Sequence, residues 1–341
     1  MIVLGIETSC DETAAAIVNS EHKILSESIH SQLDTHRKYL GVVPELAARS
    51  HVDLCDKIIM DVFNKTDFTI KDIDAIAATA GPGLIGGLLV GLTTAKAISI
   101  STKKPFLAIN HLDAHALTPR LTNKIEFPYL LLLISGGHTM FLSVEGPGKH
   151  IIIGNTIDDA LGEAFDKTAR LLGLGYPGGA ELEKLAKSGN EKRFKFPRPL
   201  KGKKGCNFSF SGLKTSVRQT AERNAPLSAQ VKADIAASFQ YTVCEVIAEK
   251  MRNAIEIFSH KNPDSKIIAA AGGVASNLYI KSTLENIAQE GGFALIVPPS
   301  KYCTDNGAMI AWAGIEHRLL GVKSDYAFDA RARWSLEGLK I

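Results

Sequence analysis

Two stretches of the chain share one pattern, in which an apolar run, a short polar turn and a second apolar run follow one another. Residues 2–6 and 13–18 flank the first turn, and residues 129–134 and 140–144 flank the second. Short apolar runs on either side of a polar or glycine-rich turn are typical of paired, buried β-strands. The same plan at two places indicates an internal duplication.

A second kind of segment also occurs twice, once after each predicted hairpin. Residues 74–80 are mainly apolar and lead into a Gly-Pro-Gly turn, after which a helix of small residues is predicted over 88–100. Residues 266–271 lead similarly into Gly272-Gly273, before a helix predicted at about 278–290. Two matched pairs in the same order predict a duplicated α/β fold of two related domains, with a ligand-binding cleft between them.

The length of 341 residues fits two domains of about 150 residues each. We expect the first domain at residues 1–124 and the second at 125–322, because polar residues precede the second hairpin. Residues 189–232 form a looser, basic insertion in the second domain. The tail, residues 323–341, is expected to pack on the first domain.

Composition excludes several classes of protein. Five scattered cysteines without a CxxC pair favour the reducing cytoplasm. The N-terminal apolar run meets acidic residues at once, and no apolar stretch of about 18 residues is free of charge, so neither a signal peptide nor a membrane span is expected. The net charge of only +3 means that nucleic-acid binding would need a local basic patch.

The best candidate for such a patch is a short run of cations interleaved with Phe194 and Phe196. Its members are Lys192, Arg193, Lys195, Arg198, Lys201, Lys203 and Lys204. Runs of this kind are usually solvated loops, but in a chain of nearly balanced charge this one is the best candidate for phosphate contacts. Glu45 and Arg49 are candidates for a protein-partner surface.

A histidine pair predicts a metal site. Asn110 follows an apolar strand and is a good N-cap, with Asp113 as a capping partner. His111 and His115 would then face the same way on one helix, about 6 Å apart at Cβ. The positive end of the helix should keep both imidazoles neutral, as ligation requires.

A third ligand is needed, and Asp305 is the best candidate, although it could instead cap the helix that follows it. His36, His51 and His138 are alternatives in less favourable settings. Leu112 occupies the place of the general-base glutamate of a zincin, so a metalloprotease is not supported. Two histidines and a carboxylate suit Fe(II) or Zn(II), and ligand type does not choose between them.

Three glycine-containing turns could bind a nucleotide. They are Ser135-Gly136-Gly137-His138, Pro177-Gly178-Gly179 and Gly272-Gly273 with Asn277. Small residues let backbone N–H groups approach phosphate oxygens. Residues 158–168 are predicted to form an acidic helix on which Asp166 either faces solvent or binds a ribose. Neither a P-loop nor a GxGxxG follows the first strand.

These same residues resemble the bacterial TsaD family, which is related to the archaeal and eukaryotic Kae proteins and whose members were once called O-sialoglycoprotein endopeptidases. The resemblance rests on residues 5–13 (GIETSCDET), 41–47 (GVVPELA), 79–84 (TAGPGL), 111–115 (HLDAH), 135–139 (SGGHT), 164–168 (AFDKT), 176–179 (YPGG) and 303–309 (CTDNGAM). It spans about residues 2–334.

The resemblance implies an actin-like, sugar-kinase and Hsp70-type fold (ASKHA, RNase H-like). It also implies transfer of threonylcarbamoyl from threonylcarbamoyl-AMP to N6 of adenosine 37, the adenosine 3′ to the anticodon of ANN-decoding tRNAs, which forms t6A and releases AMP. The implied metal ligands are His111, His115 and Asp305. The implied adenylate-binding residues are Leu133, Ile134, Ser135, Gly136, Gly137, Asp166, Gly179 and Asn277.

The family resemblance further implies one divalent metal, with Fe(II) favoured over Zn(II), and a cytoplasmic acyltransferase that modifies tRNA. The implied partners are a TsaB-type paralogue, a TsaE-type ATPase and the synthase that supplies threonylcarbamoyl-AMP. Archaeal members have tyrosine where Leu133 stands, so a metal contact from that position is not expected here.

The chemistry needs no enzyme nucleophile, because AMP is a good leaving group from the mixed anhydride. Asp11 or Glu12 is a candidate to accept a proton from the attacking amine or to orient it; a solvated acidic turn is equally compatible with the sequence. A carbohydrate kinase of the same fold and a non-enzymatic, actin-like nucleotide switch are the alternatives. Neither would use the histidine pair.

Overall fold

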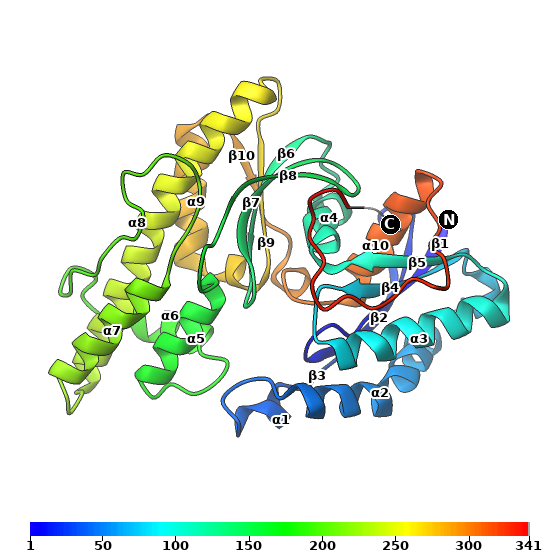
Figure 1. Cartoon of the computed structure of the whole chain (residues 1–341), viewed down its shortest axis with the longest axis horizontal. Coiled ribbons are helices and arrows are strands. Elements are labelled where there is room, and N and C mark those ends of the chain that lie inside the picture. Colours follow the sequence, from blue (N-terminus) through cyan, green and yellow to red (C-terminus); the bar gives the residue numbers. More distant parts are fainter. Residues whose placement is uncertain (340–341) are drawn as a thin grey trace. The chain divides into compact units, whose positions relative to one another are not determined.

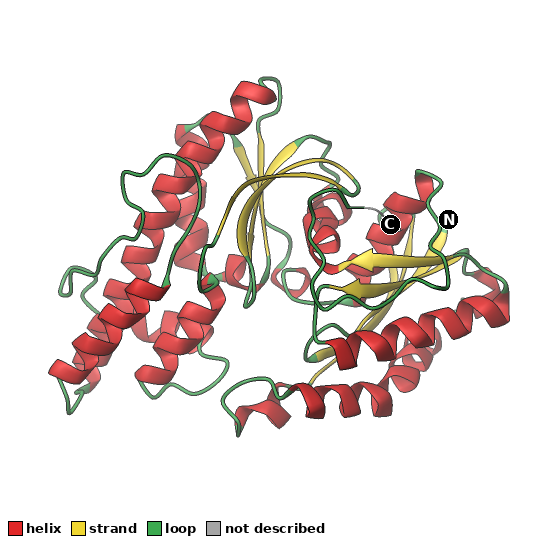
Figure 2. Ribbon diagram, viewed as in Figure 1, coloured by secondary structure: helices red, strands yellow, loops and turns green. Residues whose placement is uncertain are grey.

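The computed structural model describes residues 1–339, which divide into two compact units, and each unit is described by itself. The first unit comprises Met1–Glu126, Glu145–His150 and the chain from Thr304 onward. The second comprises Phe127–Val144 and Ile151–Cys303. The elements are labelled in Figure 1 and coloured by type in Figure 2.

The sheet of the first unit has the strand order β3-β2-β1-β4-β5. Its strands are β1 (Ile2–Glu7), β2 (Glu12–Asn19), β3 (Ile24–Ser31), β4 (Ala75–Gly81) and β5 (Phe106–Asn110). β1 is antiparallel to β2 and parallel to β4, which is parallel to β5. The predicted first hairpin, β1 and β2, therefore lies at the centre of this sheet.

Five α-helices belong to the described part of the first unit. They are α1 (Leu33–Arg37), α2 (Pro44–Asn64), α3 (Ile85–Thr102), α4 (His111–Asn123) and α10 (Gly307–Leu319), with a 3₁₀ turn at Ile70–Asp72. Helix α10 packs on β1, β2 and β4. A Cβ on Gly5 would lie 2.3 Å from the backbone nitrogen of Ala311, so this glycine lets the helix approach the sheet closely.

Among the described helices, only α3 has the length and composition to cross a membrane. The sequence had predicted no such stretch because Lys96 interrupts it. The helix packs on β4 and α2, and its buried residues include Leu88, Leu92 and Ala95. The Lys96 ammonium donates a hydrogen bond to the Phe328 carbonyl. One side of α3 is therefore covered by packing within the first unit, whereas Ile85, Leu89 and Ile100 are exposed.

The second unit repeats the plan of the first, with the strand order β10-β9-β6-β7-β8. Its strands are β6 (Tyr129–Ile134), β7 (Thr139–Gly146), β8 (Lys149–Asn155), β9 (Ile267–Ala271) and β10 (Ala294–Ile296). β6 is antiparallel to β7 and parallel to β9, as β1 is to β2 and β4. The duplicated α/β fold predicted from the sequence is confirmed.

Five α-helices belong to this unit as well. They are α5 (Leu161–Leu171), α6 (Gly179–Ala186), α7 (Ser211–Arg223), α8 (Ala229–Lys261) and α9 (Leu278–Glu290), with 3₁₀ turns at Gly273–Ser276 and Ser300–Tyr302. The helix predicted at 278–290 is confirmed as α9. The predicted insertion at 189–232 is not a loose loop, since it contains α7 and contributes Phe196, Phe208 and Phe210 to the core.

The acidic helix predicted at 158–168 begins later than expected, at Leu161. Asp158 instead accepts hydrogen bonds from the hydroxyls of Ser209 and Ser211 and from the Phe210 amide, at the start of α7. These contacts come from residues about 50 positions away, so local spacing could not reveal them.

The compact units also differ from the expected division at residue 322, because α10 groups with the first unit. The tail follows α10 and contacts the same unit. The Arg331 amide donates to the Ala80 carbonyl at 2.7 Å, and Trp334 is buried in the core of the first unit.

Candidate active site

The first candidate site lies in the first unit, at the end of β5, where α4 begins. The side-chain oxygen of Asn110 accepts hydrogen bonds from the amides of Leu112 (2.9 Å) and Asp113 (3.2 Å), so the predicted N-cap is confirmed. The Asn110 side-chain amide donates to the Trp334 carbonyl at 3.2 Å. The first turn of α4 is thus fixed both by its cap and by the tail.

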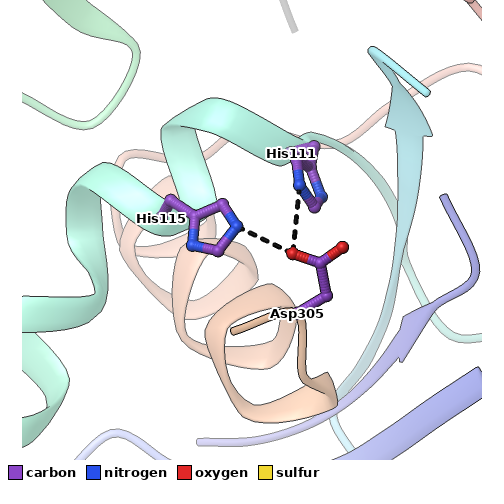
Figure 3. Close-up of side chains that lie close together, drawn as sticks. All are labelled: His111, His115 and Asp305. Carbon is purple, nitrogen blue, oxygen red and sulfur yellow. Dashed lines mark hydrogen bonds and ion pairs between the residues drawn. The ribbon is translucent and has the colours of Figure 1, made fainter. Parts of the chain in front are cut away.

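His111 and His115 project from this turn toward Asp305, as Figure 3 shows. The Asp305 Oδ1 atom lies 3.0 Å from His115 Nε2 and 3.4 Å from His111 Nε2. One ligand atom from each residue lies within 4.8 Å of the other two. The cap of α10 is Asn306, whose side chain accepts from the Met309 amide, so Asp305 remains available to face the histidines.

A buried glutamate that the sequence reasoning did not single out completes this cluster. The Glu7 carboxylate, at the end of β1, lies 3.2 Å from His111 Nδ1 and also accepts hydrogen bonds from the Ser9 amide and the Thr79 hydroxyl. Its side chain is fully buried. A charged residue in an otherwise apolar strand was the available sequence signal, since such a residue is rarely buried without a partner.

The electrostatics of His111 differ from the expectation of a neutral imidazole. Burial opposes protonation, but the Asp305 and Glu7 carboxylates outweigh it and raise the pKa of His111. Burial likewise opposes ionisation of Asp305, yet the two histidines lower its pKa. The expectation considered only the helix terminus and could not include two carboxylates that are distant in sequence.

The predicted role of Asp113 as a capping partner is wrong. Its carboxylate is fully buried and accepts from His150 Nε2 and His317 Nε2, each at 2.6 Å, and from the Gly148 amide at 3.1 Å. Burial opposes ionisation, but these hydrogen bonds lower the pKa of Asp113. This residue fixes the opposite side of α4 from the histidine pair.

Asp11 and Glu12 lie in the turn between β1 and β2 and at the start of β2. Burial and the neighbouring Asp305 and Asp11 carboxylates raise the pKa of Glu12 to about 9. At neutral pH the Glu12 carboxyl therefore retains its proton.

The alternative histidines have other structural environments. His51 Nε2 lies 3.0 Å from the Cys10 carbonyl, and its Nδ1 lies 2.8 Å from the Thr13 hydroxyl. The His36 Nδ1 atom accepts from the Val43 amide at 3.3 Å. His138 belongs to the second unit, within the turn after β6.

A second candidate site lies in the second unit, at the end of β6. Leu133 and Ile134 have fully buried side chains, so only their backbone atoms are available to a ligand. Ser135 closes the turn, because its hydroxyl accepts from the His138 amide at 3.1 Å. Gly136 and Gly137 follow, and both are exposed.

Neither of these two glycines is required by internal packing. A Cβ built on Gly136, Gly137 or Gly179 would meet no atom within 4 Å, and none of the three has a positive φ. By contrast, Gly272 has φ +92°, and a Cβ there would lie 2.4 Å from the Ile134 carbonyl oxygen. Backbone conformation and packing therefore account for a glycine at position 272, whereas the other three glycines face open space.

Asp166 and Gly179 are brought together by the turn before α6. The Asp166 carboxylate accepts from the amides of Gly178, at 2.9 Å, and Gly179. Burial outweighs these hydrogen bonds and raises the pKa of Asp166.

Asn277 caps α9 through the Ile280 amide, and its side-chain amide donates to Gln240 Oε1 at 3.0 Å. Gln240 lines a cavity of about 420 Å³ together with Glu183, Glu191 and Tyr279. Sequence reasoning missed these lining residues, because they come from α6, α8, α9 and the segment after α6, and carry no shared motif.

The cation run at residues 192–204 is partly structural. Arg193 pairs with Asp234 at 2.5 Å, and Arg198 pairs with Glu245 at 2.7 Å. Phe196 is buried, and Phe194 packs against the same core, so neither ring is available to stack on a base. Lys201, Lys203 and Lys204 remain exposed.

Solved structures place this fold in the actin-like, sugar-kinase and Hsp70-type class. HypF from T. kodakarensis superposes with a TM-score of 0.63 at 15% identity, covering 94% of this chain and 48% of that one. Component A of (R)-2-hydroxyglutaryl-CoA dehydratase from Acidaminococcus fermentans gives a TM-score of 0.55 at 15% identity, covering 94% and 100%. At these identities the likeness shows the fold alone.

Sequence comparison identifies the family. A family model described as "TsaD: tRNA N6-adenosine threonylcarbamoyltransferase" matches residues 23–312. Proteins of that name from Paramagnetospirillum magneticum and Bartonella tribocorum are 52% and 53% identical to this chain, covering 99% of it and 97% and 96% of their own lengths. The chain belongs to the TsaD family, and it is a transferase that modifies tRNA.

Proposed function

We propose that the chain transfers the threonylcarbamoyl group of threonylcarbamoyl-AMP to N6 of adenosine 37 in ANN-decoding tRNAs, with one divalent metal bound by His111, His115 and Asp305. The observation that carries this proposal is that two imidazole nitrogens lie 3.0 and 3.4 Å from one carboxylate oxygen, with all three ligand atoms within 4.8 Å of one another. Ligand atoms bound to one ion at about 2.0–2.2 Å would be separated by roughly 3–3.6 Å, so the donor set fits.

A divalent ion there would supply Lewis-acid polarisation of the threonylcarbamoyl carbonyl. Fe(II) is favoured and Zn(II) is the alternative, since this donor set suits both. Glu7 would hold His111 in the tautomer that presents Nε2. Asp11 would orient the attacking amine or accept its proton. Glu12, whose raised pKa keeps its carboxyl protonated at neutral pH, would only orient the amine.

The second unit would bind the AMP moiety. The amides of Gly136 and Gly137 would hold the phosphate, and their open surroundings support this role, because neither packing nor backbone conformation requires glycine there. Asp166, Gly179 and Asn277, together with the backbone of Leu133, Ile134 and Ser135, would bind the nucleoside. Departure of AMP breaks the anhydride bond as the new N6–carbon bond forms.

We also place the chain in the cytoplasm with a TsaB-type paralogue, a TsaE-type ATPase and a threonylcarbamoyl-AMP synthase. Its five cysteines are free in the structure, as a reducing compartment predicts. Helices α2 and α3 pack together and expose Val52, Met60 and Leu89, alongside the Glu45–Arg49 ion pair. These exposed apolar side chains are the basis on which we assign the paralogue to this pair of helices.

The test is metal analysis combined with nucleoside mass analysis. The purified chain should contain one iron or zinc, and His111→Ala and His115→Ala should lose both the metal and t6A formation. His30→Ala, at an exposed histidine of β3, is the matched control and should lose neither. A chain that makes t6A equally well after His111→Ala and His115→Ala would contradict the metal assignment.

Binding of AMP tests the proposed adenylate site of the second unit. Gly137→Ala should weaken AMP binding while leaving the melting temperature unchanged, because the added methyl meets no protein atom within 4 Å. Gly212→Ala also places a methyl in open space and should leave AMP binding unchanged. Equal AMP affinity in both variants would argue against a phosphate at this turn.

A further inference from the structure

The second unit contains a cavity lined by cations that lies apart from the residues assigned to AMP. Its volume is about 440 Å³, and it is lined by Lys167, Arg170, Leu171, Lys214, Thr215 and Arg218. These residues come from α5 and α7. Four of the six described lining side chains are cationic, and none is a carboxylate.

We propose that this cavity binds a phosphodiester of the acceptor RNA, so that α5 and α7 form part of the tRNA-binding surface. The inference rests on the proposed function for the identity of the RNA. Arginine presents a planar fork that matches phosphate oxygens, and the lysines add point charges. The volume exceeds what a single small ion needs and lies within the range of cavities that hold nucleotide-sized groups.

Two of the cations that line the cavity form ion pairs with carboxylates that do not line it. The Asp159 carboxylate lies 2.8 Å from the Lys214 ammonium and 3.2 Å from that of Lys167, and Glu163 lies 2.6 Å from Lys167. These lysines are therefore fixed before any ligand arrives, which reduces the entropy lost on binding.

Arg218 is the cation best placed to exchange its partner for a phosphate. Its distance from Glu222 is long for an ion pair, at 3.7 Å, and its side chain is 59% exposed. This ion pair therefore contributes little to stability. Arg170 lies one helical turn after Asp166, and its charge lowers the Asp166 pKa against the effect of burial. The cavity thus adjoins the helix that carries a proposed adenylate ligand.

The charge distribution along the chain favours RNA as the occupant. Residues 189–232 contain eleven lysines and arginines but only two glutamates, Glu191 and Glu222, whereas the whole chain has a net charge of +3. Lys214 and Arg218 belong to this segment, as do the exposed Lys201, Lys203 and Lys204. A concentration of positive charge in one segment suits a polyanion that contacts several points, rather than a single free phosphate.

The experiment measures tRNA binding by the full-length chain between 0.05 and 0.2 M salt. The test variants are Arg218→Glu and Thr215→Glu, the second of which places a carboxylate in the cavity without removing an ion pair. Each should weaken tRNA binding about five- to tenfold or more near 0.1 M salt and reduce the salt slope by about one, as loss of one phosphate contact predicts.

The matched control is Arg252→Glu on α8, where an arginine that is 55% exposed pairs with Glu290. It makes the same charge change and should stay within twofold of the unmodified chain. Equal effects of Arg218→Glu and Arg252→Glu would overturn the proposal, as would a chain that shows no salt-dependent tRNA binding.

A second measurement distinguishes RNA from a free nucleotide as the ligand of the cavity. Arg218→Glu should retain the affinity for AMP and the metal content of the unmodified chain. Weaker AMP binding with an unchanged tRNA salt slope would assign the cavity to the nucleotide and overturn the proposal. Failure of the proposed function would instead appear as absent metal or absent t6A in the unmodified chain, so the two failures are distinguishable.

Discussion

Glu7 is the residue whose importance is clearest from the structure and least visible in the sequence. It is a fully buried carboxylate, and three groups that come from different parts of the chain converge on it: the Ser9 amide, the Thr79 hydroxyl and His111 Nδ1. A carboxylate on the second nitrogen of a metal-binding imidazole fixes the ring and raises its basicity.

Glu7→Gln should therefore weaken metal binding about 10- to 100-fold. Competition with a chelator of known affinity, followed by metal analysis, measures the change independently of activity. Glu21→Gln, at an exposed glutamate before β3, is the control and should bind metal normally. Unchanged metal affinity in Glu7→Gln would remove Glu7 from the metal-binding group.

Asp234 provides a residue-scale prediction about pH. Its carboxylate accepts from the Asn190 amide at 2.6 Å and from Arg193 at 2.5 Å. Burial opposes ionisation, but these hydrogen bonds and one from Gln230 lower its pKa. A lowered pKa in the folded state means that the stabilisation is complete above the unfolded value of about 3.9 and is lost as pH falls through the folded value.

Asp234→Asn should lower the free energy of unfolding by about 1–3 kcal/mol at neutral pH, and the difference should shrink below about pH 4. Urea unfolding across this pH range measures it. Asp67→Asn, at an exposed aspartate, should show no such pH-dependent difference. If the difference in free energy of unfolding between the unmodified chain and Asp234→Asn were the same at all pH values, ionisation of Asp234 would not contribute to stability.

At the scale of elements, the close approach of α10 to the first sheet positions Asp305 at the end of β1. Glycines on both sides permit this approach. A Cβ on Gly5 would lie 2.3 Å from Ala311, and one on Gly307 would lie 2.4 Å from the carbonyl carbon of Ala15. Backbone contacts this close leave no room for a methyl group.

Gly5→Ala should accordingly destabilise the chain by about 1–3 kcal/mol or more, the usual cost of overpacking. Gly212→Ala, where the added Cβ lies within α7 and meets nothing within 4 Å, should be neutral or slightly stabilising, because alanine favours helix. Chemical unfolding compares the two. Equal stabilities of the two variants would show that α10 can move away from β1 without cost.

At the scale of the whole molecule, the tail after α10 completes the core of the first unit. Trp334 is 9% exposed and contacts Phe328, with ring centroids 5.1 Å apart. Its carbonyl accepts from Asn110, the cap of the helix that carries both histidines. The tail therefore supports the helix that carries His111 and His115 as well as the core.

Trp334→Ala should lower the free energy of unfolding by about 3–5 kcal/mol through the cavity it leaves. Leu320→Ala, at a leucine that is 60% exposed, should change it by less than about 0.5 kcal/mol. Thermal unfolding of the two variants, with metal content as a second measurement, tests this role. A Trp334→Ala variant as stable as Leu320→Ala would show that the tail is dispensable.

Sequence reasoning worked where periodicity or local spacing carries the information. It predicted the duplicated hairpins, helix α9, the Asn110 cap and the facing histidine pair, because all of these follow from residues close together in the chain. It placed Asp113 wrongly as a cap, because His150 and His317 compete for its carboxylate from distant segments. It missed Glu7 and the cavity between α5 and α7 for the same reason.

Hydrophobic patterning and short motifs were enough to predict the fold class, the family and the candidate metal ligands, because each of these depends on residues close together in the chain. Which groups share a buried environment could be seen only once the chain was folded. Burial is what makes a carboxylate such as Glu7 or Asp113 bind a histidine strongly, and burial depends on packing between segments more than a hundred residues apart. In the structure, a buried glutamate contacts the histidine–aspartate cluster. The structure also contains a cationic cavity that no local motif predicts.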